Sequence, residues 1–268
     1  MAIPKKIHYI WLGGGEMSQS IKDCMSTWSK VCPDYEIIAW NEHNYDMTQN
    51  QLIKNAVRAQ NWALAADIMR VEILLKHGGI YLDTDVELIK PFDDLLEYSF
   101  FIGYESKLWC NNAIIGSQAN HSLLKHVLAV YNIDATVDKH TNLMCVHTYS
   151  AVLQYFYGLK PDGKTRVLDG GIAVYSQEYF YSMHWLTRKT RHSNKSICIH
   201  RCANAWLDDT KRIKMKLIRI FRRVLTKYIT NIFEAIYVRG LYRRCRARII
   251  KVQELEISPT DDGSVKVW

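Results

Sequence analysis

One stretch of the chain, residues 62–89, constrains the fold more than any other. Its first part carries apolar side chains at helical spacing, which predicts an amphipathic helix over residues 62–76. The apolar stripe consists of Leu64, Ile68, Val71, Leu74 and Leu75. A pair of glycines then supplies a helix stop, and an apolar segment at 80–83 predicts a buried strand directly after it. A helix that leads straight into a buried strand is typical of an α/β sheet.

The rest of the chain continues this alternation of strands and helices. Further strands are expected at 7–12, 36–40, 86–89, 99–103, 112–116, 166–168, 172–175 and 196–199. Further helices are expected at 18–31, 48–59, 120–131 and 146–157. The pattern predicts the α/β class with a central sheet of mixed direction. In such sheets, ligands bind beyond the carboxyl ends of the strands.

Length and charge divide the chain into a body and a basic end. The 268 residues, 48% of them hydrophobic, fit one large domain with a helical appendage. Residues 211–251 hold fourteen Lys and Arg against one Glu, a net charge of +13, and the rest of the +8 chain therefore carries −5. We expect a catalytic domain over 1–207 and a basic helical segment over 208–268.

The basic segment has an apolar stripe at three- and four-residue steps from Leu217 to Tyr237. A basic amphipathic helix suits an anionic membrane surface, and it equally suits a core-packing helix with a solvated basic face. Nucleic acid ranks third, because no aromatic residues interleave with the basic ones as a stacking platform. We therefore expect no nucleic-acid partner.

The cysteines and the N-terminus bear on the compartment. The seven cysteines are scattered and form no C-x-x-C pair, which favours a reducing environment. Cys198 and Cys202 are four residues apart, but a zinc site needs more ligands at close spacing than the sequence offers there. Neither a secretory signal nor an apolar run long enough to span a membrane is apparent. The sequence predicts a cytoplasmic protein, held peripherally at the inner membrane face if the basic helix binds lipid.

The tripeptide Asp83-Thr84-Asp85 carries the clearest chemistry. In an extended chain, residues two apart point to the same side, so both carboxylates are expected to converge. Adjacent carboxylates repel each other unless a cation lies between them or one takes a proton. Their oxygens suit Mg²⁺ or Mn²⁺, especially an ion already held by phosphates. The position after a hydrophobic strand distinguishes this pair from the many similar tripeptides in surface loops.

Asp67, Arg70 and Trp11 are further candidates. Asp67 and Arg70 are three apart and share a helix face, where they form either a surface ion pair or contacts to a ribose and a phosphate or sugar. The small and apolar residues before Asp67 favour a buried role. Trp11 lies next to three glycines and either packs in the core or stacks on a nucleotide base.

Three segments together resemble the family 32 glycosyltransferases, which include bacterial capsular and lipopolysaccharide sugar transferases and yeast mannosyltransferases. They run from Ile3 to Trp11, from Ala65 to Arg70 and from Gly78 to Asp85. The resemblance is clear over 3–100 and becomes thin after about residue 206. It implies a GT-A type fold, a single Rossmann-like domain with a mixed central sheet. It also implies a nucleotide-sugar donor, a divalent metal and retention of anomeric configuration.

The same resemblance implies roles for individual residues. Ile10 and Trp11 would line the base site, and Asp67 and Arg70 would contact the ribose and donor sugar. Asp83 and Asp85 would serve the nucleotide and the metal, with Asp85 the direct ligand. The remaining expected contacts are Asn111 and Asn112 near the donor sugar, Trp206 over the diphosphate, and His200 or Asn204 as third metal ligand.

These observations predict transfer of a sugar from a UDP- or GDP-sugar to a hydroxyl of a glycan or a lipid-linked oligosaccharide, in surface polysaccharide synthesis. The expected cofactor is Mn²⁺ or Mg²⁺. One alternative is a metal-dependent phosphodiesterase or nuclease that uses Asp67, Asp83 and Asp85. Another is a non-enzymatic membrane-associated adaptor in which these acids are merely solvated.

Overall fold

The computed structural model describes residues 2–134, 145–183, 190, 193–202 and 249–250. Seven strands form the central sheet: β1 (Lys6–Ile10), β2 (Glu36–Trp40), β3 (Gly79–Leu82), β5 (Phe100–Tyr104), β6 (Cys110–Ser117), β7 (Arg166–Leu168) and β8 (Ile172–Tyr175). Their order is β2-β1-β3-β6-β5-β8-β7. β1 pairs in parallel with β2 and β3, whereas β6 is antiparallel to both β3 and β5. The mixed sheet expected from the sequence is confirmed.

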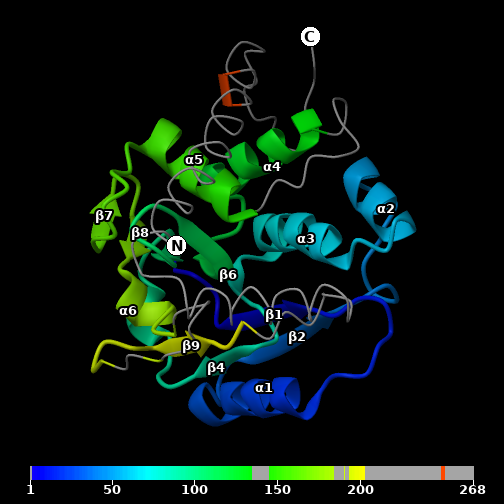
Figure 1. The fold of residues 1–268 in the computed structure, drawn as a ribbon, viewed down its shortest axis with the longest axis horizontal. Helices are drawn as coiled ribbons and strands as arrows, with labels where there is room; N and C mark the ends of the chain where they lie inside the picture. Colours follow the sequence, from blue (N-terminus) through cyan, green and yellow to red (C-terminus); the bar gives the residue numbers. More distant parts are fainter. Residues whose placement is uncertain (1, 135–144, 184–189, 191–192, 203–248, 251–268) are drawn as a thin grey trace, which may run out of the picture.

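Helices and a small second sheet cover the two faces of the central sheet (Figure 1). One face carries α3 (Trp62–His77), α4 (Ser122–Asp134) and α5 (Cys145–Tyr157), with α2 (Gln51–Arg58) packed beside α3. The other face carries α1 (Gln19–Val31) and the two-stranded sheet of β4 (Val86–Leu88) and β9 (Cys198–His200). Two short helical turns, η1 (Asp93–Leu95) and α6 (Gln177–Phe180), are additional elements that the sequence pattern did not predict.

The core forms two hydrophobic clusters, one on each face of the sheet. Strand side chains alternate between them because successive residues of a strand point to opposite faces. In β3, Tyr81 belongs to the cluster under α3, whereas Ile80 and Leu82 belong to the cluster under α1. Ile249 is 1% exposed and belongs to the cluster under α3, so this residue of the basic segment packs on the body.

The connection from α3 to β3 is built from two glycines in left-handed conformations. The Asn61 side chain accepts a hydrogen bond from the backbone N–H of Leu64 and caps the start of α3. Gly78 ends the helix at φ 61°, and a Cβ there would lie 2.8 Å from the backbone nitrogen of Ala119. The turn therefore needs glycine, and it delivers the chain into β3 without a loop.

Strand β4 is held along both of its edges. One edge pairs with β9, in a register that places Val86 opposite His200. On the other edge, the Trp28 indole donates to the carbonyl of Val86 at 2.7 Å, and the backbone N–H of Leu88 donates to Thr27 Oγ1 at 2.9 Å. These bonds fix the chain directly after Asp85 and bring His200 beside it.

Some expectations fall outside the described residues. They are the boundary between 207 and 208, the basic helix apart from residues 249–250, and the side chains of Asn204 and Trp206. Among the residues that the structure describes, no helix is both long and apolar enough to cross a membrane.

Candidate active site

The two acids of the Asp83-Thr84-Asp85 motif lie just past the carboxyl end of β3. The segment is not extended but forms a turn, in which the backbone N–H of Val86 donates to the carbonyl of Asp83 at 3.0 Å. The turn nevertheless brings the two carboxylates toward a common point, which lies beside His200 of β9. Asp85 is the more deeply buried of the two side chains, at 13% exposure against 30% for Asp83.

His200, the last residue of β9, completes this group. Its Nε2 lies 3.3 Å from Asp85 Oδ1 and 4.0 Å from Asp83 Oδ2. The backbone N–H of Arg201 donates to the carbonyl of Asp85 at 2.9 Å, which continues the β4–β9 pairing around the site. The predicted neighbourhood of His200 and the acid pair is therefore present, although the two segments are more than a hundred residues apart in sequence.

Asp83, Asp85 and His200 suit a divalent cation by their donor atoms. Each offers one ligand atom, and these atoms lie within 4.8 Å of one another. Two carboxylate oxygens and one imidazole nitrogen are a donor set for Mn²⁺ or Mg²⁺ that leaves positions for phosphate oxygens. The residues present therefore fit the metal that the sequence predicts.

Arg70 joins the helix α3 to the acid pair. Its guanidinium lies 2.8 Å from Asp67 Oδ1 and 3.4 Å from Asp83 Oδ1, and it donates to the carbonyl of Asn112 at 2.9 Å. Its Cζ atom lies 4.4 Å from the ring centroid of Tyr81, whose hydroxyl donates to Asp83. Asp67 and Arg70 are not a surface pair, since their side chains are 15% and 6% exposed.

The pKa of His200 reflects this crowded environment. Burial by itself lowers the pKa, but the neighbouring Cys202 and Asp85 more than offset that effect, and the pKa lies well above its ordinary value. A cation and a proton compete for the same ring, because a metal ligand histidine must be neutral at the coordinating nitrogen.

The arrangement of these residues along the chain matches a known family. Residues 18–101 match the family described as "Glycosyltransferase sugar-binding region containing DXD motif", and this range contains Asp67, Arg70, Asp83 and Asp85. Over this range the chain is similar to the family 32 glycosyltransferases. Together with the mixed sheet, this similarity confirms the expected GT-A type α/β fold.

Individual proteins similar to this chain include two yeast proteins and one solved structure. Inositol phosphoceramide mannosyltransferase 3 of Schizosaccharomyces pombe is 29% identical over 131 residues, 47% of this chain and 36% of that protein. Mannosyl phosphorylinositol ceramide synthase SUR1 of Saccharomyces cerevisiae is 24% identical over 237 residues, 86% of this chain and 59% of that protein. The chain therefore spans less than two thirds of the length of either relative. The structure of PaToxG Glycosyltransferase is similar with a TM-score of 0.47 and 20% identity, covering 57% of this chain and 69% of that one.

Asn111 and Asn112 lie inside β6, which begins at Cys110, two residues before the expected strand at 112–116. Asn111 Oδ1 accepts from the backbone N–H of Ala113, and the Asn111 carbonyl accepts from the Tyr181 hydroxyl at 2.9 Å. Tyr181 in turn packs edge-on against His200, with ring centroids 5.8 Å apart. Asn111 of β6 is thus connected to His200 through Tyr181.

The expected base-binding residues lie at the carboxyl end of β1. This end lies at the same sheet edge as Asp83, because β1 and β3 are parallel and pair His8 with Tyr81. Ile10 packs in the core cluster under α3, whereas Trp11 is half-buried and donates from its indole to the carbonyl of Gly15 at 2.7 Å. Trp62 lies against this loop, and a Cβ at Gly13 would come within 2.9 Å of its ring.

Five residues near the site had no assigned role in the sequence analysis: Tyr81, Trp62, Glu105, Tyr181 and Cys202. Tyr81 had a usable signal, since it lies two positions before Asp83 at the end of a strand. Glu105 and Tyr181 had none, because only the pairing of distant strands brings them near His200.

Proposed function

We propose that this glycosyltransferase is a metal-dependent, retaining enzyme that moves a sugar from a UDP- or GDP-sugar to a hydroxyl of a glycan or lipid-linked acceptor. The observation that carries the proposal is the convergence of Asp83, Asp85 and His200, with ligand atoms within 4.8 Å, at the carboxyl end of β3. We place the reaction in surface polysaccharide synthesis, as the resemblance implies.

In this proposal Asp83, Asp85 and His200 hold Mn²⁺ or Mg²⁺, which when bound neutralises the charge that develops on the departing diphosphate. The protein's own contribution is to hold the two carboxylates in place. The buried guanidinium of Arg70 and the hydroxyl of Tyr81 both contact Asp83 and fix the orientation of its carboxylate. The β4–β9 pairing orients Asp85 and His200 toward each other.

Arg70 acts in this proposal as a positioning residue. Its guanidinium is engaged with Asp67, Asp83 and the Asn112 carbonyl, and its Nε donates to the Ala66 carbonyl at 3.2 Å. A guanidinium with these partners orients the acids and keeps the ribose side of the site rigid. Asp67, which pairs with this guanidinium, is the proposed acceptor for a ribose hydroxyl.

The names of the two yeast relatives point to the sugar and acceptor that should be tested first. Both names state a mannosyl group and an inositol-phosphate ceramide. We infer that an activated mannose is a donor candidate and that a lipid carrying a polar hydroxylated head is an acceptor candidate. The donor panel below therefore includes an activated mannose.

The test is release of nucleoside diphosphate from a panel of UDP- and GDP-sugars, with Mn²⁺, with Mg²⁺ and with EDTA. We expect release from one donor, loss of release in EDTA, and a fall of about 10³-fold in Asp85→Asn, comparable to losing one strong electrostatic contact in a transition state. Asp94→Asn, which changes an exposed acid of η1 in the same way, is the matched control and should keep full activity. Metal-independent release, or equal activity in Asp85→Asn, would refute the proposed site.

We also propose that residues 1–207 form the catalytic domain and that the basic segment 208–268 holds the enzyme on an anionic membrane surface. The support is the +13 charge of residues 211–251 and their apolar stripe. Because Ile249 is part of the core, charge substitutions are a cleaner test than deletion. Arg222→Gln, Arg223→Gln and Lys227→Gln together should weaken co-sedimentation with phosphatidylserine vesicles by at least tenfold, at about 1 kcal/mol per charge. Unchanged sedimentation, or equal binding to neutral vesicles, contradicts the proposal.

A further inference from the structure

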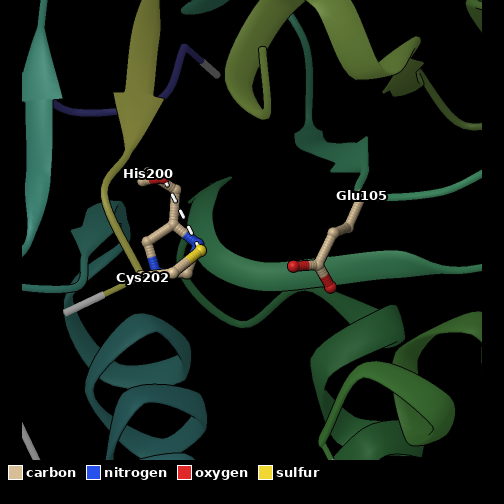
Figure 2. Close-up of side chains that lie close together, drawn as sticks. All are labelled: Glu105, His200 and Cys202. Carbon is tan, nitrogen blue, oxygen red and sulfur yellow. Dashed lines mark hydrogen bonds between the residues drawn. The ribbon is translucent and has the colours of Figure 1, made fainter. Parts of the chain in front are cut away.

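A second group of potential metal ligands lies on the other side of His200 (Figure 2). It consists of Glu105, directly after β5, His200 at the end of β9, and Cys202 two residues later. The carboxylate of Glu105 extends toward the sulfur and the imidazole ring from across a gap. One ligand atom of each residue lies within 4.8 Å of the others.

The backbone at Cys202 turns its thiol back onto His200. Cys202 has φ 48°, in the left-handed region that non-glycine residues seldom occupy, at a cost of about 1 kcal/mol. In this conformation its Sγ lies 3.6 Å from His200 Nδ1 and also 3.6 Å from the His200 carbonyl oxygen. Cys198, the first residue of β9, is buried with its sulfur toward the carbonyl of Phe180, and it takes no part in the group.

The two ring nitrogens of His200 therefore face different chemistry. Nε2 faces the carboxylates of Asp83 and Asp85, which are hard oxygen ligands. Nδ1 faces Cys202, a soft sulfur ligand, with Glu105 nearby. Soft thiolates select ions such as Zn²⁺ and Cd²⁺, whereas carboxylates suit Mg²⁺ and Mn²⁺.

We propose that Glu105, His200 Nδ1 and Cys202 form a second metal site, selective for thiophilic divalent ions such as Zn²⁺. One sulfur, one nitrogen and one oxygen ligand, with water in the fourth position, make an open tetrahedral site. Bonds of about 2.0–2.3 Å require the ligand atoms to approach by about 1 Å, a movement that the Glu105 side chain can supply from the end of its strand. Binding releases to solvent the thiol proton and any proton on Nδ1, since both ligands coordinate in their deprotonated forms.

His200 is a ligand in both metal sites, the second of which is proposed here and the first of which rests on the proposed function. A neutral imidazole has only one nitrogen with a free lone pair, so the ring serves one ion at a time. An ion at the Cys202 side holds the ring in the tautomer whose Nε2 carries the proton. Zn²⁺ at this site should therefore weaken activation of transfer by Mn²⁺, and removal of Cys202 should relieve that inhibition.

The binding test uses the full chain and Co²⁺, which fits tetrahedral sulfur-containing sites and gives a sulfur-to-metal charge-transfer absorption. We expect one equivalent of Co²⁺ to produce this band and Zn²⁺ to displace it. Cys202→Ser should abolish the band, and Glu105→Gln should weaken Co²⁺ binding by about tenfold. Cys32→Ser, which changes a buried cysteine at the far end of α1, is the matched control and should retain the band.

Asp85→Asn separates this proposal from the proposed function. The variant removes a ligand of the hard site only, so the charge-transfer band should persist even if no donor is ever hydrolysed. A band of unchanged strength and affinity in Cys202→Ser overturns the site, as does a band that Asp85→Asn abolishes. Circular dichroism melting verifies that each variant folds. If Cys202→Ser does not fold, Glu105→Gln, which changes a ligand on a different part of the chain, tests the site independently.

Discussion

The candidate site has two halves that are built in different ways. The contiguous half, residues 62–85, holds Asp67, Arg70, Asp83 and Asp85 on one helix, one glycine turn and one strand end. The assembled half consists of Glu105, His200 and Cys202, which come from the ends of β5 and β9. In the first half local geometry positions the residues, whereas in the second half strand pairing does. A short motif can therefore specify the first half completely, whereas the sequence singled out only His200 in the second half.

Two histidines show how this difference affects charge. His8 of β1 is fully buried, its Nε2 lies 2.9 Å from the Gly78 carbonyl, and its Nδ1 accepts from the Trp40 indole at 3.1 Å. Burial is the main cause that lowers its pKa to about 4. His200 lies among acidic and sulfur groups, and its pKa is raised. His8, beside the contiguous half, is therefore a structural residue, whereas His200, in the assembled half, can bind a ligand.

The largest expected effect is in the contiguous half. Arg70→Leu leaves Asp67 and Asp83 without the guanidinium that lies against both, so we expect a loss of about 3 kcal/mol in the free energy of unfolding. Transfer should fall below detection in the same variant. Urea denaturation and diphosphate release measure the two effects, with Arg58→Leu, an exposed arginine at the end of α2, as control. If Arg70→Leu costs no more than Arg58→Leu, the contiguous half does not depend on this buried pair.

Much of the fold and the contiguous half could be predicted from the sequence, because each rests on local rules. Apolar periodicity and glycine stops predicted α1, α3 and the seven strands of the sheet to within a few residues. The predicted residues Asp67, Arg70, Asp83 and Asp85 do lie together.

What could not be predicted depends on distant pairing. The turn at Asp83–Asp85 has a sequence that equally suits an extended chain, and only the attachment of β4 to α1 and β9 decides between them. Glu105 and Tyr181 are polar residues with no periodic or motif signal, and β5, β6 and the bridge between Tyr181 and Ile199 bring them to His200. These contacts join residues that are far apart in the chain, so no short window of the sequence contains a signal for them.

The second prediction addresses the assembled half. His200→Gln removes the imidazole from the acid pair, and we expect the half-saturating Mn²⁺ concentration for transfer to rise by about 10- to 100-fold, since both Asp carboxylates remain. Titration of Mn²⁺ against diphosphate release measures the shift. His43→Gln changes an exposed histidine and should leave the titration unchanged. An unchanged titration in His200→Gln would mean that the contiguous half binds the cation by itself.

The third prediction concerns pH. The pKa of folded His8 is lowered to about 4, so between pH 6.5 and pH 4 the unfolded chain takes up a proton there and the folded protein does not. His8 therefore lowers the free energy of unfolding as pH falls through this window, by up to about 1.4 kcal/mol per pH unit. Urea denaturation at several pH values should show a shallower slope in His8→Gln than in the wild type. The slope is the criterion, because the variant also loses hydrogen bonds to Gly78 and Trp40; equal slopes would mean that His8 protonates in the folded state.

The smallest expected effect tests whether strand pairing or a surface contact holds the assembled half. Arg201 pairs with Glu87 across the β4–β9 sheet, but the two side chains are 42% and 31% exposed, and such pairs contribute less than about 1 kcal/mol. The backbone bond from Arg201 to Asp85 and the register of Val86 with His200 do not depend on the guanidinium. Arg201→Gln should therefore lower the free energy of unfolding by no more than Lys195→Gln, which breaks the comparably exposed pair with Glu178. Half-saturation by Mn²⁺ should also stay within about twofold. A tenfold shift in Arg201→Gln alone would show that His200 is held beside Asp85 by this ion pair, and the assembled half would then depend on side chains as much as the contiguous half does.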